Sequence, residues 1–98
     1  MILSRDQITK VVREYFHDKP VNKVWLFGSY ARNEADEESD VDFLIEIKTD
    51  SGLGLRYLLW NEDIEAMINK KVEIVSAGGV SEYIRPFIEK DKRLIYER

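Results

Sequence analysis

The chain has 98 residues, of which 44% are hydrophobic, 35% are charged and none is cysteine. This length suits one domain over residues 1–98, and the absence of cysteine excludes a disulfide scaffold and a thiolate metal site. No apolar run exceeds four residues, and the charged Arg5 and Asp6 lie close to the N-terminus. We therefore expect a cytoplasmic protein with neither a membrane span nor a signal peptide.

The charge balance also limits the possible partners. Fifteen basic and nineteen acidic residues give a formal net charge of −4. A protein that only holds nucleic acid by its phosphates usually has a basic excess, so this balance argues against that function. An acidic chain is compatible with a site that attracts divalent cations and with a basic protein partner.

The first two predicted elements are a helix and a buried strand. Ser4-Arg5-Asp6-Gln7 has the form of a capping box, and the apolar residues that follow keep the spacing of one helical face: Ile8, Val11, Val12, Tyr15 and Phe16. Residues 24–27 are all apolar and end at Gly28, which predicts a strand covered on both faces with Trp25 in the core. We expect residues 29–33 to form one helical turn or to begin a short helix.

The clearest predicted strand covers residues 40–47, where apolar and polar positions alternate. Helical spacing continues over residues 57–68, and a third strand is predicted over residues 72–75. Ser81 is expected to cap a last helix in which Pro86 makes a kink or occupies the first turn, and residues 94–96 fit a final strand or a helical tail. This order predicts an α/β domain but does not say which strands are parallel.

Two carboxylates stand out in the second strand. The alternation places Asp40 and Asp42 on one face, with α-carbons roughly 6–7 Å apart. Two acids this close repel each other unless a cation lies between them, and oxygen ligands from one strand suit Mg²⁺ or Mn²⁺. The alternative is a solvated strand end or a turn.

A phosphate cradle is predicted just before this pair. Gly28-Ser29 follows a buried strand, where free backbone N–H groups and a hydroxyl can hold a phosphate. The same dipeptide is also an ordinary strand-to-helix turn. The combination with Asp40 and Asp42 is more specific, because an anion cradle beside a cation site is what a metal–triphosphate ligand requires.

Glu73 is a candidate third acid. It is the one acidic residue in the strand-like segment 71–75, and it faces Asp40 and Asp42 if the two strands are neighbours. In a two-metal displacement a third carboxylate holds the activating ion and can accept a proton. The alternative for Glu73 is a surface position on its strand.

Three segments together resemble the minimal nucleotidyltransferase family of the DNA polymerase β-like superfamily: residues 26–32 (LFGSYAR), 39–44 (SDVDFL) and 71–75 (KVEIV). The similarity spans nearly the whole chain. It implies the polymerase β-like fold, a small mixed sheet flanked by helices. Such domains are often encoded beside an all-helical HEPN-type toxin and act as antitoxins that transfer AMP from ATP to a toxin tyrosine.

By this resemblance, Asp40 and Asp42 bind the metals, Gly28 and Ser29 hold the triphosphate, and Glu73 stands at the third-carboxylate position. Glu73 departs from the family, where this acid is usually Asp.

A second departure follows Arg32, where Asn33 replaces a common glycine. Asn tolerates a left-handed backbone better than other non-glycine residues, so this change is expected to be neutral. Arg32 is expected to tie the loop to nearby acids, and a direct phosphate contact is the alternative.

The sequence therefore predicts a metal-dependent enzyme that transfers a nucleoside monophosphate, AMP from ATP, to a hydroxyl of a partner protein such as a HEPN-type toxin. The chain has no room for a domain that holds the acceptor, so a partner or a second copy must complete the site. The alternative is a non-catalytic module that neutralises its partner by covering it, and Glu73 is the residue that favours it. Transfer to a small molecule is a weaker third alternative.

Overall fold

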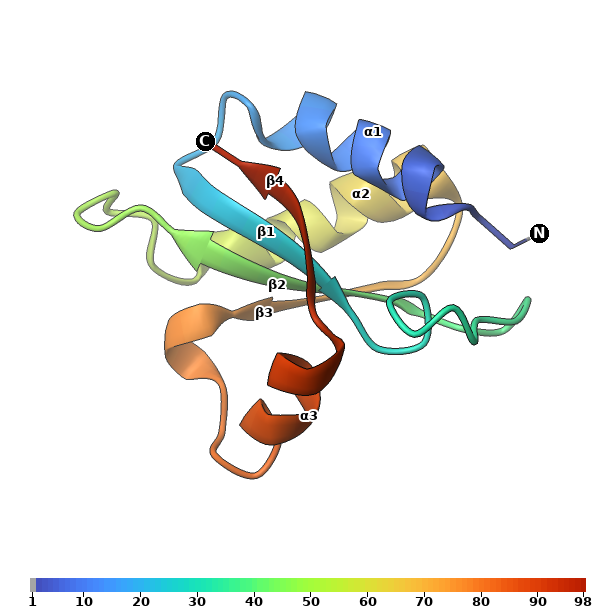
Figure 1. The fold of residues 1–98 in the computed structure, drawn as a ribbon. Coiled ribbons are helices and arrows are strands. Elements are labelled where there is room, and N and C mark those ends of the chain that lie inside the picture. The colour runs from blue at the N-terminus through green and yellow to red at the C-terminus, as the bar shows by residue number, and fades with distance from the viewer. Residues whose placement is uncertain (1) are drawn as a thin grey trace.

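The computed structural model describes residues 2–98, in which three α-helices accompany a four-stranded mixed sheet (Figure 1). The elements in chain order are α1 (Arg5–Phe16), β1 (Val21–Phe27), β2 (Val41–Ile47), α2 (Trp60–Ile68), β3 (Val72–Ser76), α3 (Arg85–Asp91) and β4 (Arg93–Glu97). Two 3₁₀ segments, η1 (Gly54–Leu59) and η2 (Ala77–Gly79), precede α2 and follow β3. The predicted mixed α/β fold is confirmed. None of the helices described is long and apolar enough to cross a membrane.

The strand order is β3-β2-β1-β4. β1 runs antiparallel to both of its neighbours, whereas β2 and β3 are parallel. A parallel pair needs a crossover connection, and here the crossover contains α2. The register places Asp42 beside Phe27 on one side and beside Glu73 on the other.

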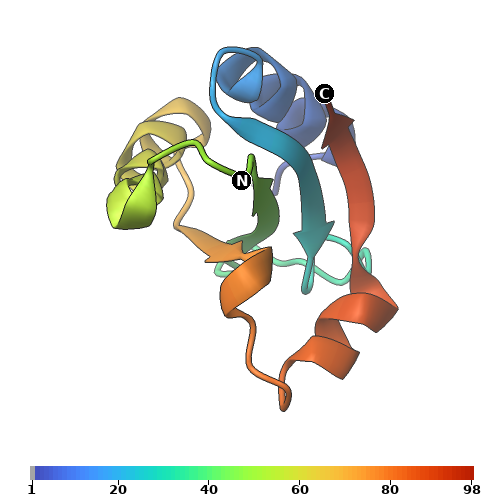
Figure 2. The same ribbon diagram turned by 90° about the vertical axis from the view of Figure 1, so that its left-hand side faces the viewer.

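The main core lies between the sheet and helices α1 and α2, which cover the same face (Figures 1 and 2). Alternate residues of β1 and β2 point into it, and the helices contribute residues at i, i+4 and i+8 spacing, as the apolar periodicity predicts. The rings of Phe16 and Trp60 meet edge to face, 5.5 Å apart between centroids. The buried residues of these four elements are Ile8, Val12, Phe16, Val21, Val24, Leu26, Val41, Phe43, Ile45, Trp60, Ile64 and Ile68.

The opposite face of the sheet is covered less completely, by the short helix α3. Leu44 and Ile88 are buried outside the main core and line a cavity of about 280 Å³ together with Trp25. Trp25 is partly exposed rather than in the core, so that prediction is wrong. Instead, the Lys92 ammonium lies 4.9 Å from its ring centroid, a cation–π contact.

Local signals explain most element boundaries. Ser4 and Gln7 form the predicted capping box, and Asn69 ends α2 with a left-handed backbone. Pro86 lies in the first turn of α3, while the Ser81 side chain does not cap this helix. Residues 29–33 make turns and do not continue into a helix, and residues 93–97 form a strand rather than a helical tail.

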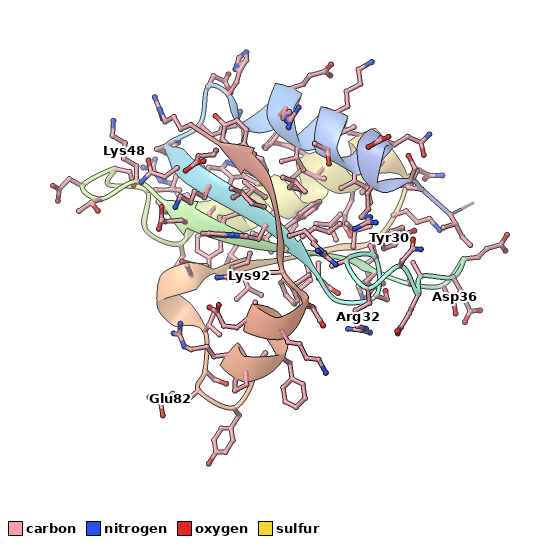
Figure 3. The ribbon with its side chains drawn as sticks, in the orientation of Figure 1. Tyr30, Arg32, Asp36, Lys48, Glu82 and Lys92 are labelled. Atoms are coloured by element: carbon pink, nitrogen blue, oxygen red, sulfur yellow. The ribbon has the colours of Figure 1, made fainter. Side chains whose placement is uncertain are left out.

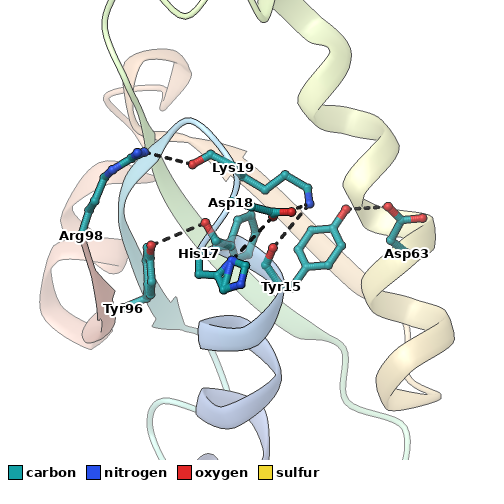
Figure 4. A network of polar contacts seen from close by, with 8 residues as sticks. Tyr15, His17, Asp18, Lys19, Asp63, Tyr96 and Arg98 are labelled. Atoms are coloured by element: carbon teal, nitrogen blue, oxygen red, sulfur yellow. Dashed lines mark hydrogen bonds and ion pairs between the residues drawn. The ribbon is translucent and has the colours of Figure 1, made fainter.

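Polar contacts fasten the end of α1 to α2 and to β4 (Figure 4). The Tyr15 hydroxyl donates to Asp63 at 2.5 Å, and the Tyr96 hydroxyl donates to the Phe16 carbonyl at 3.5 Å. The Arg98 guanidinium donates to the Lys19 carbonyl at 3.2 Å. Burial, followed by the hydrogen bond to Asp63, raises the pKa of the Tyr15 hydroxyl well above its usual range.

The core assignment predicts a large difference between two phenylalanines. Phe16 is fully buried, whereas Phe87 on α3 is 70% exposed. We expect Phe16→Ala to lower the free energy of unfolding by about 3–5 kcal/mol and Phe87→Ala to change it by about 0.5 kcal/mol or less. Urea denaturation of both variants measures this, and equal losses would contradict the assignment of the core to the α1–α2 face.

Candidate active site

The turn after β1 is built around Gly28. Its φ of +76° lies in the left-handed region, and a Cβ atom at this position would overlap the Asp42 carboxylate. The Arg32 N–H donates to the Gly28 carbonyl at 3.0 Å, and the Glu34 N–H donates to the Ser29 carbonyl at 2.9 Å. Glycine is therefore required both by the turn and by the close approach of Asp42.

Ser29 follows Gly28 in this turn. Among residues 2–98, neither its backbone N–H nor its hydroxyl has a hydrogen-bond partner. A free N–H and a hydroxyl at a tight turn form the kind of concavity that holds phosphate. The geometry is therefore compatible with the predicted cradle, although the turn does not open a helix.

The carboxylates lie on the sheet face opposite the main core. Val41 and Phe43 are buried in the core, so Asp42 between them points to the other face. Asp42 is half-buried, and Asp40 is exposed just before β2. Glu73 is also exposed and pairs in register with Asp42 on the neighbouring strand, where strands are about 4.7–4.9 Å apart. The structure thus brings together the three acids that the sequence singled out.

The pKa of the Asp42 carboxyl is raised to about 7. Burial is the largest cause, because it disfavours the charged form. The negative charges of Glu73 and Asp40 and a hydrogen bond with Glu73 add to the shift, while the Arg32 guanidinium opposes it. Burial and the neighbouring acids therefore disfavour the ionised form of Asp42 in this site.

The donor chemistry fits a hard divalent cation such as Mg²⁺ or Mn²⁺. Within the described residues, no three acidic or histidine side chains converge as a ready-made metal cage. Mg²⁺ is commonly held by one or two carboxylates together with substrate phosphates. Asp40 and Asp42 beside the Gly28–Ser29 turn supply that incomplete set, and a cation there would relieve the repulsion that raises the Asp42 pKa.

Arg32, labelled in Figure 3, ties the turn to other parts of the chain. Its guanidinium donates to Glu34 at 3.2 Å and to Asp91 of α3 at 2.7 Å, and these hydrogen bonds raise the Arg32 pKa, Asp91 first. The expectation that Arg32 holds the loop to nearby acids is confirmed. Asp91 was not predicted, because a partner 59 residues away leaves no local sequence signal.

An apolar pocket of about 360 Å³ opens beside the acids. Asp42 and Glu73 form its polar end. Its apolar walls come from the ends of β1 and β3, from the segment that leads into α3 and from α3 itself: Phe27, Val75, Val80, Ile84 and Ile88. Sequence reasoning missed this pocket. The available signal was that Phe27 and Val75 are apolar residues in the two strands next to Asp42.

Comparison with known proteins identifies the family. Residues 7–98 match the family described as Polymerase beta, Nucleotidyltransferase. The chain belongs to this nucleotidyltransferase family. The predicted enzyme class is therefore confirmed. A candidate protein adenylyltransferase of Methanocaldococcus jannaschii is 34% identical over 89% of this chain and 84% of the relative. The protein adenylyltransferase MntA of Thermococcus cleftensis is 38% identical over 67% of this chain and 63% of the relative.

Solved structures share the fold at low sequence identity. A toxin–antitoxin structure with AMP-PNP has a TM-score of 0.75 at 17% identity, covering 98% of this chain and 75% of that chain. A tri-AMPylated Shewanella oneidensis HEPN toxin in complex with an MNT antitoxin has a TM-score of 0.65 at 15% identity, covering 95% and 69%. The polymerase β-like fold expected from the resemblance is confirmed.

The close approach at Gly28 predicts a selective defect. We expect Gly28→Ala to displace Asp42 and to lower the free energy of unfolding by roughly 1–3 kcal/mol through strain, with loss of ATP binding. Gly78→Ala is the matched control, because nothing lies within 4 Å of a Cβ at that position. Calorimetric titration with ATP and urea denaturation test both variants. Unchanged ATP binding by Gly28→Ala would contradict the role of this turn.

The raised pKa of Asp42 predicts that the metal-free protein loses stability as pH rises. The unfolded chain releases this proton near pH 4, whereas the folded chain keeps it to about pH 7. The stabilising contribution is thus complete below pH 4 and is lost as pH rises through 7. Asp42→Asn has no carboxyl group to ionise at this position. We therefore expect the metal-free variant to have a higher free energy of unfolding than wild type at pH 8.

Urea denaturation at pH 5 and pH 8 in the presence of a chelator measures this effect. The exposed acid Asp36 offers a control, because Asp36→Asn leaves the carboxylate pair intact. Equal stability of wild type and Asp42→Asn at pH 8 would contradict a raised pKa of Asp42 in the folded chain.

Proposed function

We propose that this nucleotidyltransferase transfers AMP from ATP to a hydroxyl of a partner protein and requires a divalent cation. One observation carries the proposal: the glycine turn after β1 lies against the Asp42 carboxylate, and the parallel β2–β3 pair puts Glu73 on the other side of Asp42. A phosphate cradle, a cation-binding pair and a proton acceptor are thus adjacent.

Each residue has a role in this proposal. The Ser29 N–H and hydroxyl bind a phosphate of ATP, and Gly28 lets the chain approach it. Asp40 and Asp42 would hold Mg²⁺ or Mn²⁺, which neutralises phosphate charge and activates oxygen nucleophiles when bound. Glu73, one methylene longer than the usual Asp, accepts the proton of the attacking hydroxyl. Arg32 positions the turn through Asp91.

The partner is inferred from the relatives and from the open site. The relatives named above are a candidate protein adenylyltransferase and the protein adenylyltransferase MntA, and one similar structure is of an MNT antitoxin with a HEPN toxin. The pocket beside Asp42 and Glu73 has a volume of about 360 Å³, which is room enough for an acceptor side chain from another molecule. We therefore infer a HEPN-type toxin as the acceptor and an antitoxin role for this chain, with a homo-oligomer as the other way to complete the site.

The test is AMP transfer to the product of the neighbouring gene, taken as the candidate HEPN-type partner. With ATP and Mg²⁺ we expect an AMP mass increment on that protein. Asp42→Asn should abolish the increment, and Glu73→Gln should slow transfer by roughly 10²–10⁴-fold. Asp36→Asn, in an exposed loop, should transfer normally.

Intact-mass spectrometry follows the increment, and gel filtration follows complex formation. A complex that forms without any transfer would overturn the enzymatic proposal and favour neutralisation by covering the partner. A rate unaffected by Glu73→Gln would remove Glu73 from the mechanism and leave the remaining roles in place.

A further inference from the structure

We propose that Tyr83 is an acceptor for this protein's own nucleotidyl transfer, so that one copy adenylylates a second copy. The inference rests on the proposed function, because it uses the same site and the same ATP. It assigns a modification site to the short segment between η2 and α3.

Tyr83 differs from the other four tyrosines in its exposure. Its side chain is 91% exposed, whereas Tyr30 is 3% exposed. Tyr15 and Tyr96 are partly buried, and their hydroxyls donate hydrogen bonds. Tyr57 is partly buried as well. Tyr83 is therefore the tyrosine whose hydroxyl is most accessible to another molecule.

The position of Tyr83 relates it to the active site. Its neighbours Ser81 and Ile84 line the pocket that also contains Asp42 and Glu73, so the segment that carries Tyr83 forms part of the wall of that pocket. The N–H groups of Ile84 and Arg85 both donate to the Ser81 carbonyl, at 3.2 and 3.0 Å, which fixes a turn around Tyr83. Figure 3 shows the adjacent Glu82 at the end of this segment, away from the sheet.

The pocket is chemically suited to a phenol. Its walls are apolar, as a ring requires, and its carboxylates lie where a hydroxyl would reach. Tyr83 is not part of the lining of its own pocket, which favours transfer between copies. Ile84 and Phe87 are 54% and 70% exposed beside it and supply apolar contact area. In a pair of copies related by a twofold axis, the segment that carries Tyr83 in one copy faces the pocket of the other copy, and the reverse contact is identical.

The reaction is the same displacement as on the partner protein. The Tyr83 oxygen bonds to the α-phosphorus of ATP, and the bond between that phosphorus and the oxygen that bridges to the β-phosphate breaks. Pyrophosphate leaves, and the phenolic proton passes to Glu73 of the copy that binds ATP. The product is a tyrosyl–AMP phosphodiester on the other copy.

Peptide mapping tests the site directly. The purified chain is incubated with ATP and Mg²⁺ and digested with trypsin, which leaves residues 72–90 as one peptide because Pro86 follows Arg85. We expect an AMP increment whose fragment ions place it on Tyr83. Tyr83→Phe should lose this label, and Tyr57→Phe should keep it. A label on Ser76 or Ser81 in the same peptide would overturn the assignment.

A mixing experiment tests transfer between copies. Asp42→Asn lacks activity but keeps Tyr83, while Tyr83→Phe keeps the active site. Label on the Asp42→Asn copy in the mixture supports transfer between copies, and its absence there while wild type labels itself overturns it. If the partner protein receives AMP and Tyr83 does not, this inference alone fails. If neither receives AMP, the proposed function fails as well.

Discussion

The contact between the Gly28 turn and the Asp42 carboxylate is the constraint on which the site depends. A side chain at position 28 would occupy the space of that carboxylate, and the positive φ of Gly28 turns the chain back at the end of β1. Phe27, the residue just before Gly28, pairs with Asp42 in the sheet. The Gly28–Ser29 turn and the start of β2 are therefore held against each other at the end of the β1–β2 pair.

The parallel pairing of β2 and β3 adds a third carboxylate to this unit at an energetic cost. Asp42 and Glu73 are in register, and burial, together with the negative charge of Glu73, raises the Asp42 pKa. A fold selected for stability alone would not place these acids side by side. The apolar core on the α1–α2 face can tolerate this repulsion because it is separated from the acids by the sheet itself. The repulsion between the acids is thus confined to the sheet face opposite the main core.

Sequence reasoning succeeded where the signal is local or periodic. The capping box at Ser4 and the alternation around Asp42 follow from the chain itself, and both are present. It failed where a contact joins residues that are far apart in the sequence, and where a sheet face is only partly covered by a helix. Arg32 contacts Asp91 across 59 residues, which no spacing rule can identify. Trp25 has an apolar pattern typical of a core strand, but α3 is too short to bury that face, and Lys92 covers the ring instead.

The incomplete cover of the second sheet face links the fold to its chemistry. α3 has seven residues and leaves the pocket beside Asp42 and Glu73 open, with apolar walls from Phe27 and Val75. The same helix holds Asp91, which accepts a hydrogen bond from Arg32 and so ties α3 to the segment after the Gly28–Ser29 turn. α3 is therefore anchored beside the acids, yet its seven residues are too few to cover the sheet face on which Asp42 lies.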